Sequence, residues 1–395
     1  DSQQLRDGVL FIADPATFGL VTLSLSAIIF GAYQSRALYF HRSSDGDSDQ
    51  QMNRSPPLLA TSSSVIKKRT AILLPILGSV VLVVLFYWLK KIYYLLLIIL
   101  VGCSLFSVAF IQWPFATYFI KVIRVRFPRF PTKITLLRFM GRIPLELFLV
   151  APIPITLGVL YFVFDHWVIL DIFSLSIVAF ALSVLRVTNL KIAVVMLTFF
   201  FLYDMFWVFG SSLIFKQNVM VVVATNLATN FSYRLPMAIQ IPTVFRDHVN
   251  ILGLGDIILP GFFLCFLYRF DMSTSGHAWQ GYFLNACIGY TVGLLLALIM
   301  MVSMAGLAQP ALTYLVPCTI LPTIVLGYAR KELNNLWTGS SGRLHTLRSS
   351  SGIIEDVVEP DGVSIQLEVL SQDDQNVLDE DDEIDPEEGI EMEAI

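Results

Sequence analysis

The sequence predicts an all-α polytopic membrane protein with nine transmembrane helices. Of its 395 residues, 55% are hydrophobic and only 14% are charged, and the mean hydropathy is +0.70. Soluble domains contain about 25% charged residues, so this composition excludes an ordinary soluble protein. Apolar runs of about 20 residues, the length that crosses the roughly 30 Å hydrocarbon core of a bilayer, recur along the chain.

Nine apolar segments are candidate transmembrane helices. They cover roughly residues 10–33, 70–89, 92–113, 143–164, 167–185, 192–214, 251–270, 281–306 and 310–329. The second and third are separated only by Lys90 and Lys91, which predicts a tight hairpin. The fourth contains Pro144, Pro152 and Pro154. Because proline removes a helical hydrogen bond, we expect this span to be bent.

The distribution of Lys and Arg predicts the orientation of the chain in the membrane. With a lumenal N-terminus and a cytosolic C-terminus, the cytosolic segments hold 20 basic residues and the lumenal segments hold six. Residues 121–142 alone contain seven basic residues and no acidic one. Since basic residues concentrate in cytosolic loops, we expect this orientation. The same rule explains the basic loops without nucleic acid, which we do not expect as a partner.

Composition divides the chain into three parts. Residues 1–188 form an N-terminal transmembrane half with spans one to five, and residues 189–331 form a second half with spans six to nine. Residues 332–395 are strongly acidic toward their end, with 17 acidic residues and no Lys or Arg from Glu355 onward. Such a segment cannot bury enough apolar surface to fold, which predicts a disordered cytosolic tail.

The four cysteines give no sign of a metal site or a disulfide framework. Cys103, Cys265, Cys287 and Cys318 all lie inside apolar runs, without the spacing of metal ligands. We interpret them as core or lipid-facing residues, and we expect no metal and no cofactor.

Two aspartates lie deep inside predicted spans, where an ionisable side chain is costly and usually functional. Asp204 lies in TFFFLYDMFWVFG of the sixth span, and Asp256 lies in ILGLGDIILPG of the seventh. Because consecutive antiparallel elements are usually neighbours, we expect both aspartates at similar depth on facing helices. Glu146, Asp165 and Asp171 lie near span ends, and we interpret them as interface residues that reach water.

A pair of close carboxylates in a medium of low dielectric constant cannot easily ionise twice, so the two share one proton. The ionised member can take a proton from water while the protonated member donates to a carbonyl oxygen, which is the chemistry of aspartic proteases. The same pair could instead form the ion site of a transporter or a structural hydrogen bond. The residues alone leave these three alternatives open.

Glycine weakens the seventh span just before its aspartate. Gly253 and Gly255 precede Asp256, and each glycine costs about 1 kcal/mol in a helix relative to alanine. They loosen the helix and allow another backbone to approach closely. Broken helices also line ion sites in transporters, so this feature does not separate a protease from a transporter.

The ninth span opens with QPALTYLVPCTILP, residues 309–322. Pro310 has no N–H, and the residue before a proline is biased away from helix, so the span begins here. We expect Pro317 and Pro322 to interrupt the helix that follows.

Together these elements resemble the intramembrane aspartyl proteases of the presenilin and signal peptide peptidase superfamily. The family pattern is YD in span six, GxGD in span seven and PAL at span nine. Here the motifs read Tyr203-Asp204, Gly253-Leu254-Gly255-Asp256 and Pro310-Ala311-Leu312. The lumenal N-terminus fits the signal peptide peptidase branch, and FLYDMFWVFGSSLIFKQNVMVVVAT looks most like its Golgi-type signal peptide peptidase-like 3 subgroup.

The resemblance implies roles for individual residues. Asp204 and Asp256 would form a catalytic dyad in the second half of the chain, supported by Tyr203, Gly253 and Gly255. Substrate positioning would fall to Gln309, Pro310, Ala311 and Leu312.

The resemblance also implies a nine-span presenilin-like fold and an endopeptidase that needs no metal. Its expected partners are type II single-span membrane proteins and the lipid bilayer, and self-association is left open. The expected compartment is the Golgi or the endoplasmic reticulum, with the plasma membrane or endosome as further compartments. An ion-coupled transporter and a non-catalytic receptor or chaperone are the alternatives.

Overall fold

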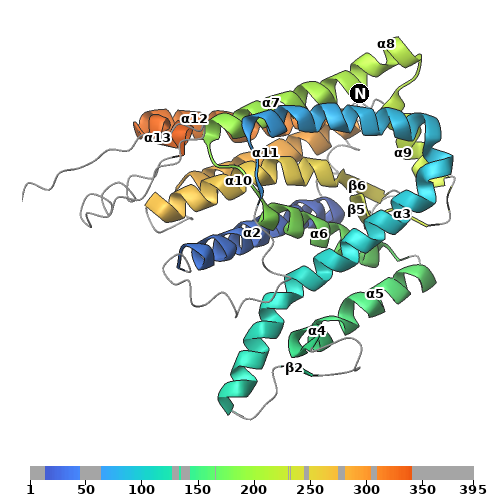
Figure 1. The fold of residues 1–395 in the computed structure, drawn as a ribbon. Coiled ribbons are helices and arrows are strands. Elements are labelled where there is room, and N and C mark those ends of the chain that lie inside the picture. The colour runs from blue at the N-terminus through green and yellow to red at the C-terminus, as the bar shows by residue number, and fades with distance from the viewer. Residues whose placement is uncertain are drawn as a thin grey trace, which may run out of the picture. The chain divides into compact units, whose positions relative to one another are not determined.

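The computed structural model describes residues 14–44, 64–126, 133–134, 143–164, 166–229, 231, 233–243, 249–274, 281–303 and 309–339. All of them belong to one compact unit, Asp1–Leu344. Most of these residues are helical, as Figure 1 shows. Asp165 and the acidic segment that begins at Glu355 lie outside the described residues.

Eight helical segments of the described chain are long and apolar enough to cross a membrane, so the protein is a multi-pass membrane protein. They are built from α2 (Pro15–Ser44), α3 (Lys68–Arg126), α4 (Leu145–Val150) with α5 (Pro152–Val163), α6 (Trp167–Val184), α7 (Leu190–Met205) with its continuation, α10 (Leu254–Thr274), α11 (Tyr282–Ser303) and α12 (Leu312–Ala329).

α3 contains both the second and the third predicted spans. It is 59 residues long, although a single crossing needs only about 20. Its backbone leaves helical geometry at Trp88, with φ −119° and ψ 15°. The chain turns back in α3, as Figure 1 shows. The hairpin expected at Lys90 and Lys91 is thus formed by a kink at Trp88, and nine predicted spans become eight helices.

Proline has different effects in the fourth and ninth predicted spans. In the fourth, a turn at Ala151 separates α4 from α5, but Ala151 keeps a helical φ of −61° and ψ of −36°, so the predicted bend stays a prediction. In the ninth, α12 runs continuously through Pro317 and Pro322, so the predicted interruption is wrong. Membrane helices tolerate proline where a neighbouring helix accommodates the freed backbone groups.

A glycine of α11 accommodates one of these freed groups. Pro322 cannot donate to the Cys318 carbonyl four residues earlier, and this carbonyl lies against Gly289 of α11. A Cβ on Gly289 would overlap the carbonyl oxygen of Cys318, and one on Gly293 would lie 3.0 Å from Cys318 Cβ. Small residues one turn apart therefore let the backbones of α11 and α12 approach closely.

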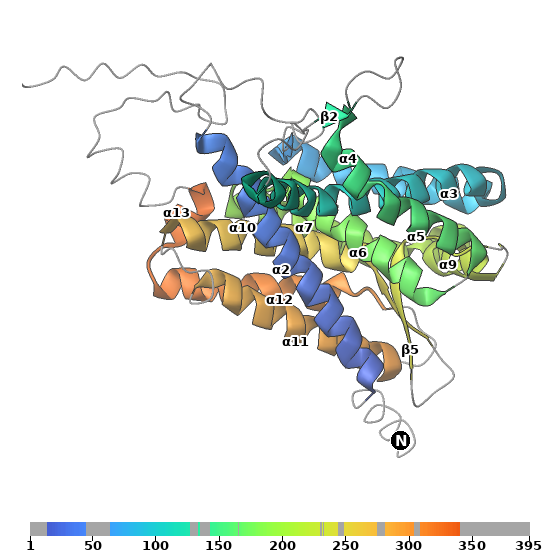
Figure 2. The ribbon, with the colours of Figure 1, turned by 90° about the horizontal axis from the view of Figure 1, so that it is seen from below.

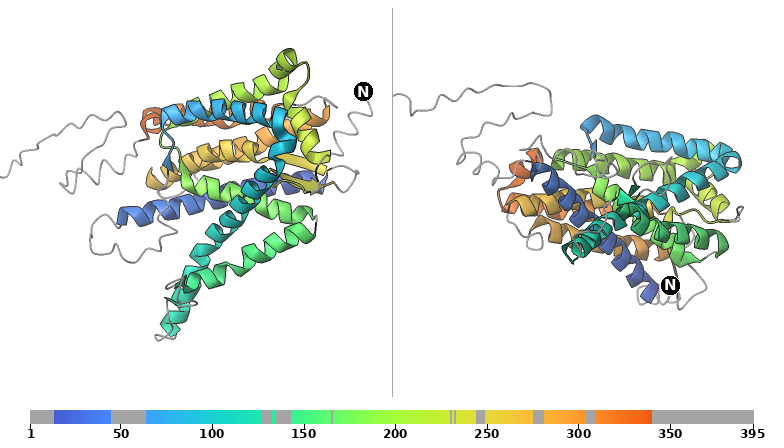
Figure 3. Two further views of the ribbon diagram at one scale, coloured as in Figure 1. Left: turned by 45° about the vertical axis from the view of Figure 1, so that its right-hand side comes forward. Right: turned by 60° about the horizontal axis from the view of Figure 1, so that its bottom comes forward.

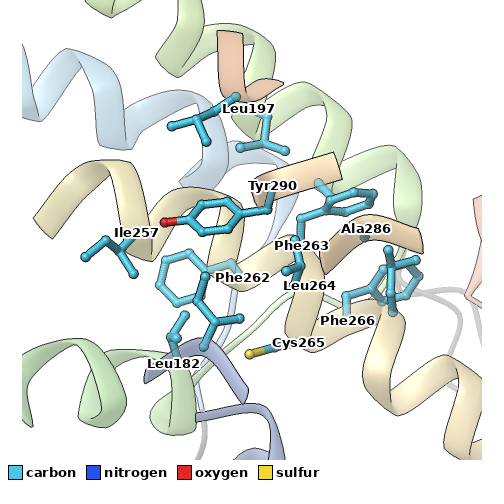
Figure 4. Close-up of a cluster of buried hydrophobic side chains, with 14 of the residues drawn as sticks. Leu182, Leu197, Ile257, Phe262, Phe263, Leu264, Cys265, Phe266, Ala286 and Tyr290 are labelled. Atoms are coloured by element: carbon cyan, nitrogen blue, oxygen red, sulfur yellow. The ribbon is translucent and has the colours of Figure 1, made fainter. Parts of the chain in front are cut away.

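One hydrophobic core joins the two predicted halves of the chain. It includes Leu20 of α2, Leu182 of α6, Leu197 of α7, Phe263 of α10 and Tyr290 of α11, several of which are labelled in Figure 4. Glycines also allow helices to pack closely in this core. Cβ atoms added at Gly31 and Gly261 would lie 2.7 and 2.8 Å from atoms of Leu182, so α2, α6 and α10 pack tightly around this leucine.

Short strands supplement the predicted all-α fold. β1 (Ser64–Val65) pairs in parallel with β4 (Leu185–Arg186), and β2 (Lys133–Ile134) pairs antiparallel with β3 (Ile143–Pro144). The longest pair is an antiparallel hairpin of β5 (Ala238–Pro242) and β6 (Val249–Gly253). This hairpin contacts α6 and the N-terminal end of α2, and Figures 2 and 3 show it beside these helices.

Four shorter helical elements complete the described chain. η1 (Phe206–Gly210) is a π-helical turn that continues α7, and α8 (Ser211–Phe215) follows it. α9 (Val219–Thr229) lies between spans six and seven. α13 (Leu333–Thr338) falls within the segment assigned to the acidic tail, but Leu336 is fully buried in the core, so the ordered fold extends past residue 331.

We expect Gly289→Ala to destabilise the protein because its Cβ would overlap the Cys318 carbonyl oxygen. Overpacking of this kind costs about 1–3 kcal/mol, which thermal unfolding of the purified protein would detect. Gly102→Ala is the matched control, since a Cβ there would meet nothing within 4 Å and should leave the melting temperature unchanged or higher. Equal stability of the two variants would contradict the close packing of α11 against α12.

Candidate active site

Asp204 lies near the end of α7, and its side chain is only 7% exposed. Its Oδ2 accepts a hydrogen bond of 3.2 Å from the backbone N–H of Leu312. Leu312 is the first residue of α12, and the first N–H groups of a helix have no partner within the helix. The helix start also carries a partial positive charge, so it stabilises a carboxylate placed there.

Asp256 lies in the first turn of α10, two residues after the helix begins at Leu254. Its side chain is only partly buried. A carboxylate is favoured in the first turn of a helix for the same electrostatic reason. Each aspartate therefore stands at the start of a helix, α12 for Asp204 and α10 for Asp256.

The structure brings the two aspartates into one site. α7 packs against both α10 and α12, and the charge of Asp204 acts on Asp256. The Leu312 N–H reaches Asp204 across 108 positions of sequence. The helices that carry YD, GxGD and PAL therefore converge, and they form an acidic pair in which Asp204 is buried, Asp256 is partly buried and the start of α12 is directed at Asp204.

Tyr203 precedes Asp204, and its ring packs mainly toward α3. It contacts the rings of Phe200 and Trp207, and a Cβ on Gly78 of α3 would lie 3.5 Å from its ring. The charge of Asp204 acts on its hydroxyl. This placement gives Tyr203 a packing role beside the acidic pair, and its proposed influence on hydrogen bonding there stays a prediction.

Gly253 and Gly255 lie where a strand becomes a helix. Gly253 ends β6 and Gly255 is the second residue of α10, so the expectation of a weakened but continuous helix before Asp256 is wrong. A Cβ on Gly253 would lie 3.4 Å from Oδ2 of Asp256, whereas one on Gly255 would meet nothing within 4 Å. Gly255 thus leaves open space one residue from the aspartate.

The remaining motif residues lie at the N-terminal end of α12. Pro310 is buried, Ala311 is partly buried, and their carbonyls accept the first hydrogen bonds of the helix. Gln309 accepts a 3.4 Å hydrogen bond from the hydroxyl of Tyr314. Leu312 contacts Asp204 through its backbone N–H, so in this structure the motif directs the N-terminal end of α12 at Asp204.

The π-helical turn η1 was not predicted. It begins two residues after Asp204, and the indole N–H of Trp207 within it donates to Ser79 Oγ of α3 at 3.1 Å. Such turns inside α-helices often mark functional sites. The apolar run from residue 192 to 214 contains no residue pattern that predicts a wider turn, so this element could not be inferred from the sequence.

The β5–β6 hairpin leads directly into Asp256. The N–H of Leu254 donates to the carbonyl of Met237, which makes this pair a hydrogen-bonded pair of the ladder. In an antiparallel ladder such pairs alternate with pairs whose N–H and C=O groups point outward. The register then leaves three residues of β6 with outward-pointing backbone groups: Val249, Ile251 and Gly253.

The interpretation of Asp171 as an interface residue is wrong. Asp171 is only 4% exposed, and its Oδ1 accepts a 2.8 Å hydrogen bond from the backbone N–H of Gln240 in β5. Asp271, which the predicted spans left out, is also buried and accepts a 2.7 Å bond from the N–H of Phe283. Glu146 lies in the first turn of α4, in agreement with its predicted place near a span end.

No group of three or more His, Cys, Asp or Glu side chains that could hold a metal occurs within the described part of the chain.

Comparison with known proteins links these motifs to one family. The sequence model of the signal peptide peptidase family matches residues 59–343, which include all three motifs. Signal peptide peptidase-like 5 of Arabidopsis thaliana is 42% identical over 173 residues, which cover 43% of this chain and 32% of that protein. Signal peptide peptidase-like 3 of the same plant is 38% identical over 207 residues, 51% of this chain and 38% of that protein.

A human relative is similar as well. Signal peptide peptidase-like 2A of Homo sapiens is 34% identical over 185 residues, 44% of this chain and 35% of that protein. The matched part thus spans about a third of the length of these relatives. Their names carry different numbers, so they do not single out one subgroup.

Proposed function

The chain belongs to the signal peptide peptidase family, and we propose that it is an intramembrane aspartyl endopeptidase with Asp204 and Asp256 as its catalytic dyad. The observation that supports this most directly is the convergence of the two aspartates on packed helices, with the Leu312 N–H bonded to Asp204. The helix start favours negative charge on one member of the pair, and this asymmetry is what a general base beside a general acid requires.

The dyad would hydrolyse an amide by general acid–base catalysis. The Leu312 N–H and the start of α12 favour negative charge on Asp204, so this residue takes a proton from water. The water oxygen bonds to the carbonyl carbon while Asp256 donates the shared proton to the carbonyl oxygen. The tetrahedral intermediate then collapses: the C–N bond breaks as the proton on Asp204 passes to the leaving nitrogen. One hydroxyl of the intermediate returns its proton to Asp256, which leaves a carboxylic acid, an amine and the dyad with its one shared proton.

A transmembrane substrate has to be unwound before this reaction, because a helix hides its amides in its own hydrogen bonds. We propose that the unwound segment adds as a strand to the outer edge of β6. Ile251 and Gly253 present backbone groups at this edge, and Ile251 is 54% exposed. The hairpin ends at the residue before α10, which places this edge beside Asp256.

The family and the charge distribution support further parts of the proposal. The substrates are type II single-span membrane proteins, including glycan-modifying enzymes if the chain is of the Golgi-type subgroup 3. The N-terminus is lumenal, the C-terminus is cytosolic, and the compartment is the Golgi or the endoplasmic reticulum. Asp204, Asp256 and the backbone supply the chemistry without a cofactor.

We expect Asp256→Ala and Asp256→Asn to lower cleavage of a labelled type II transmembrane peptide by about 10²–10⁴-fold, because each removes the acid of the dyad. The measurement is product formation by purified protein in liposomes. Both variants should accumulate normally, since Asp256 is only partly buried. Normal cleavage by either variant would refute the mechanism, and proton- or sodium-coupled flux without cleavage would favour a transporter.

We expect Gly255→Ala to keep the stability of the wild type and to lower kcat/KM about tenfold, because its Cβ fills open space beside Asp256 where the substrate segment has to approach. Gly102→Ala, which also adds a methyl group in open space but lies on α3, should cleave like the wild type. An undiminished kcat/KM for Gly255→Ala would show that the open space serves neither water nor substrate.

We expect Ile251→Pro to lower kcat/KM for a transmembrane peptide about two- to tenfold, the effect of one lost hydrogen bond. Proline removes an outward N–H at an edge and leaves the bonds between β5 and β6 in place, so the melting temperature should hold. Ile251→Val keeps the N–H and serves as the control. If the two variants cleave equally, the substrate does not add to β6.

A further inference from the structure

The segment that leads into β5 and β5 itself are held by side chains from three helices of the N-terminal half. Tyr93 of α3 donates to the carbonyl of Tyr233 at 2.6 Å, and Tyr161 of α5 donates to the carbonyl of Arg234 at 2.8 Å. These two hydroxyls fix the chain just before the strand begins. Each bond joins residues distant in sequence, so the contacts are tertiary and not part of a local turn.

α6 holds the strand itself from the side. Ser174 donates its hydroxyl to the carbonyl of Ala238 at 3.0 Å, and the N–H of Gln240 donates to Asp171 at 2.8 Å. Ala238 and Gln240 are two of the three residues of β5 whose backbone groups the register points away from β6, the third being Pro242 at the end of the strand. The outer edge of β5 is therefore held by α6, whereas no strand of the described residues pairs with the outer edge of β6.

Among the groups that hold β5, Asp171 is the one whose burial costs the most free energy, because it is a carboxylate. A buried carboxylate inside a membrane span is destabilising unless it is bonded, so it is retained where it performs a task. Oδ1 of Asp171 is bonded to Gln240, while Oδ2 is buried without a hydrogen-bond partner among the described residues. A serine hydroxyl could hold a strand at less cost, as Ser174 does one turn further along.

We propose that Asp171, together with Ser174, is a positioning residue that fixes β5 to α6 and so holds the open edge of β6 in register with Asp256. This inference rests on the proposed proteolytic function. Because adjacent strands pair in steps of two residues, a hairpin that slides against α6 would present a different substrate bond to the dyad. Asp171 would act through the backbone of β5 and would not touch the substrate.

The test compares variants of the full-length protein in liposomes, with a labelled type II transmembrane peptide as the substrate. Asp171→Leu should lower kcat/KM about tenfold or more and spread cleavage over neighbouring peptide bonds, as mass spectrometry of the products would show. Asp171→Asn keeps an oxygen acceptor for the Gln240 N–H and should restore most of the rate and the original cleavage site.

Two further measurements separate positioning from mere stability. A biotinylated hydroxyethylene transition-state isostere should label Asp171→Leu as well as the wild type, because the dyad itself is intact. Ser176→Ala is the matched control on α6, since among the described residues its hydroxyl donates to the carbonyl of Ile172 in the same helix. If Asp171→Leu accumulates poorly, Gln240→Pro removes the same bond from the strand side and should give the same spread of products.

Wild-type rate and cleavage site in Asp171→Leu would overturn the positioning role and leave the proposed protease intact. A parallel loss of rate, isostere labelling and thermal stability at an unchanged cleavage site would also overturn it, as a purely structural effect. If the wild type forms no more product than Asp256→Ala does, both the proposed proteolytic function and this inference are refuted.

Discussion

The central constraint on this fold is the placement of two carboxylates inside an apolar helical bundle. An aspartate in such surroundings needs a partner, and the described structure supplies helix starts: the N–H of Leu312 bonds to Asp204, and Asp256 stands in the first turn of α10. Two helices must begin beside the acidic pair, well within the bundle. The proline before α12 and the strand before α10 are consequences of that requirement.

A helix that begins inside the bundle is preceded by non-helical backbone whose polar groups need partners. The N-terminal half of the chain supplies these partners. Its helices α3, α5 and α6 hold the segment around β5, while Gly31 and Gly261 let α2 and α10 pack against Leu182 of α6. The halves predicted as separate parts therefore share one core and divide the task, one carrying the dyad and the other fixing the hairpin that leads to it.

The sequence was sufficient for the elements that depend on composition or on motifs, and insufficient for those that depend on distant contacts. Length and hydropathy predicted the spans, the adjacency of spans six and seven predicted that Asp204 and Asp256 would face each other, and the family resemblance implied that Leu312 lies near them. The hairpin escaped prediction because VNILG continues into the apolar run of α10 without a polar break. Asp171 was misread because its partner is the backbone of Gln240, 69 residues away, which no local pattern reveals.

The open edge of β6 can serve two needs of an intramembrane protease: it can bind the unwound substrate, and it can hold water near Asp256. Backbone N–H and C=O groups cannot remain unpaired in an apolar medium, and only closed structures cross a bilayer without them. Among the described residues no strand pairs with the outward groups of Ile251 and Gly253, so water has to meet them until a strand is added. Water held there lies a few residues from Asp256, where hydrolysis needs it, and an entering substrate strand would replace it bond for bond. A single unpaired strand edge thus accounts both for wetting the acidic pair and for receiving the unwound segment.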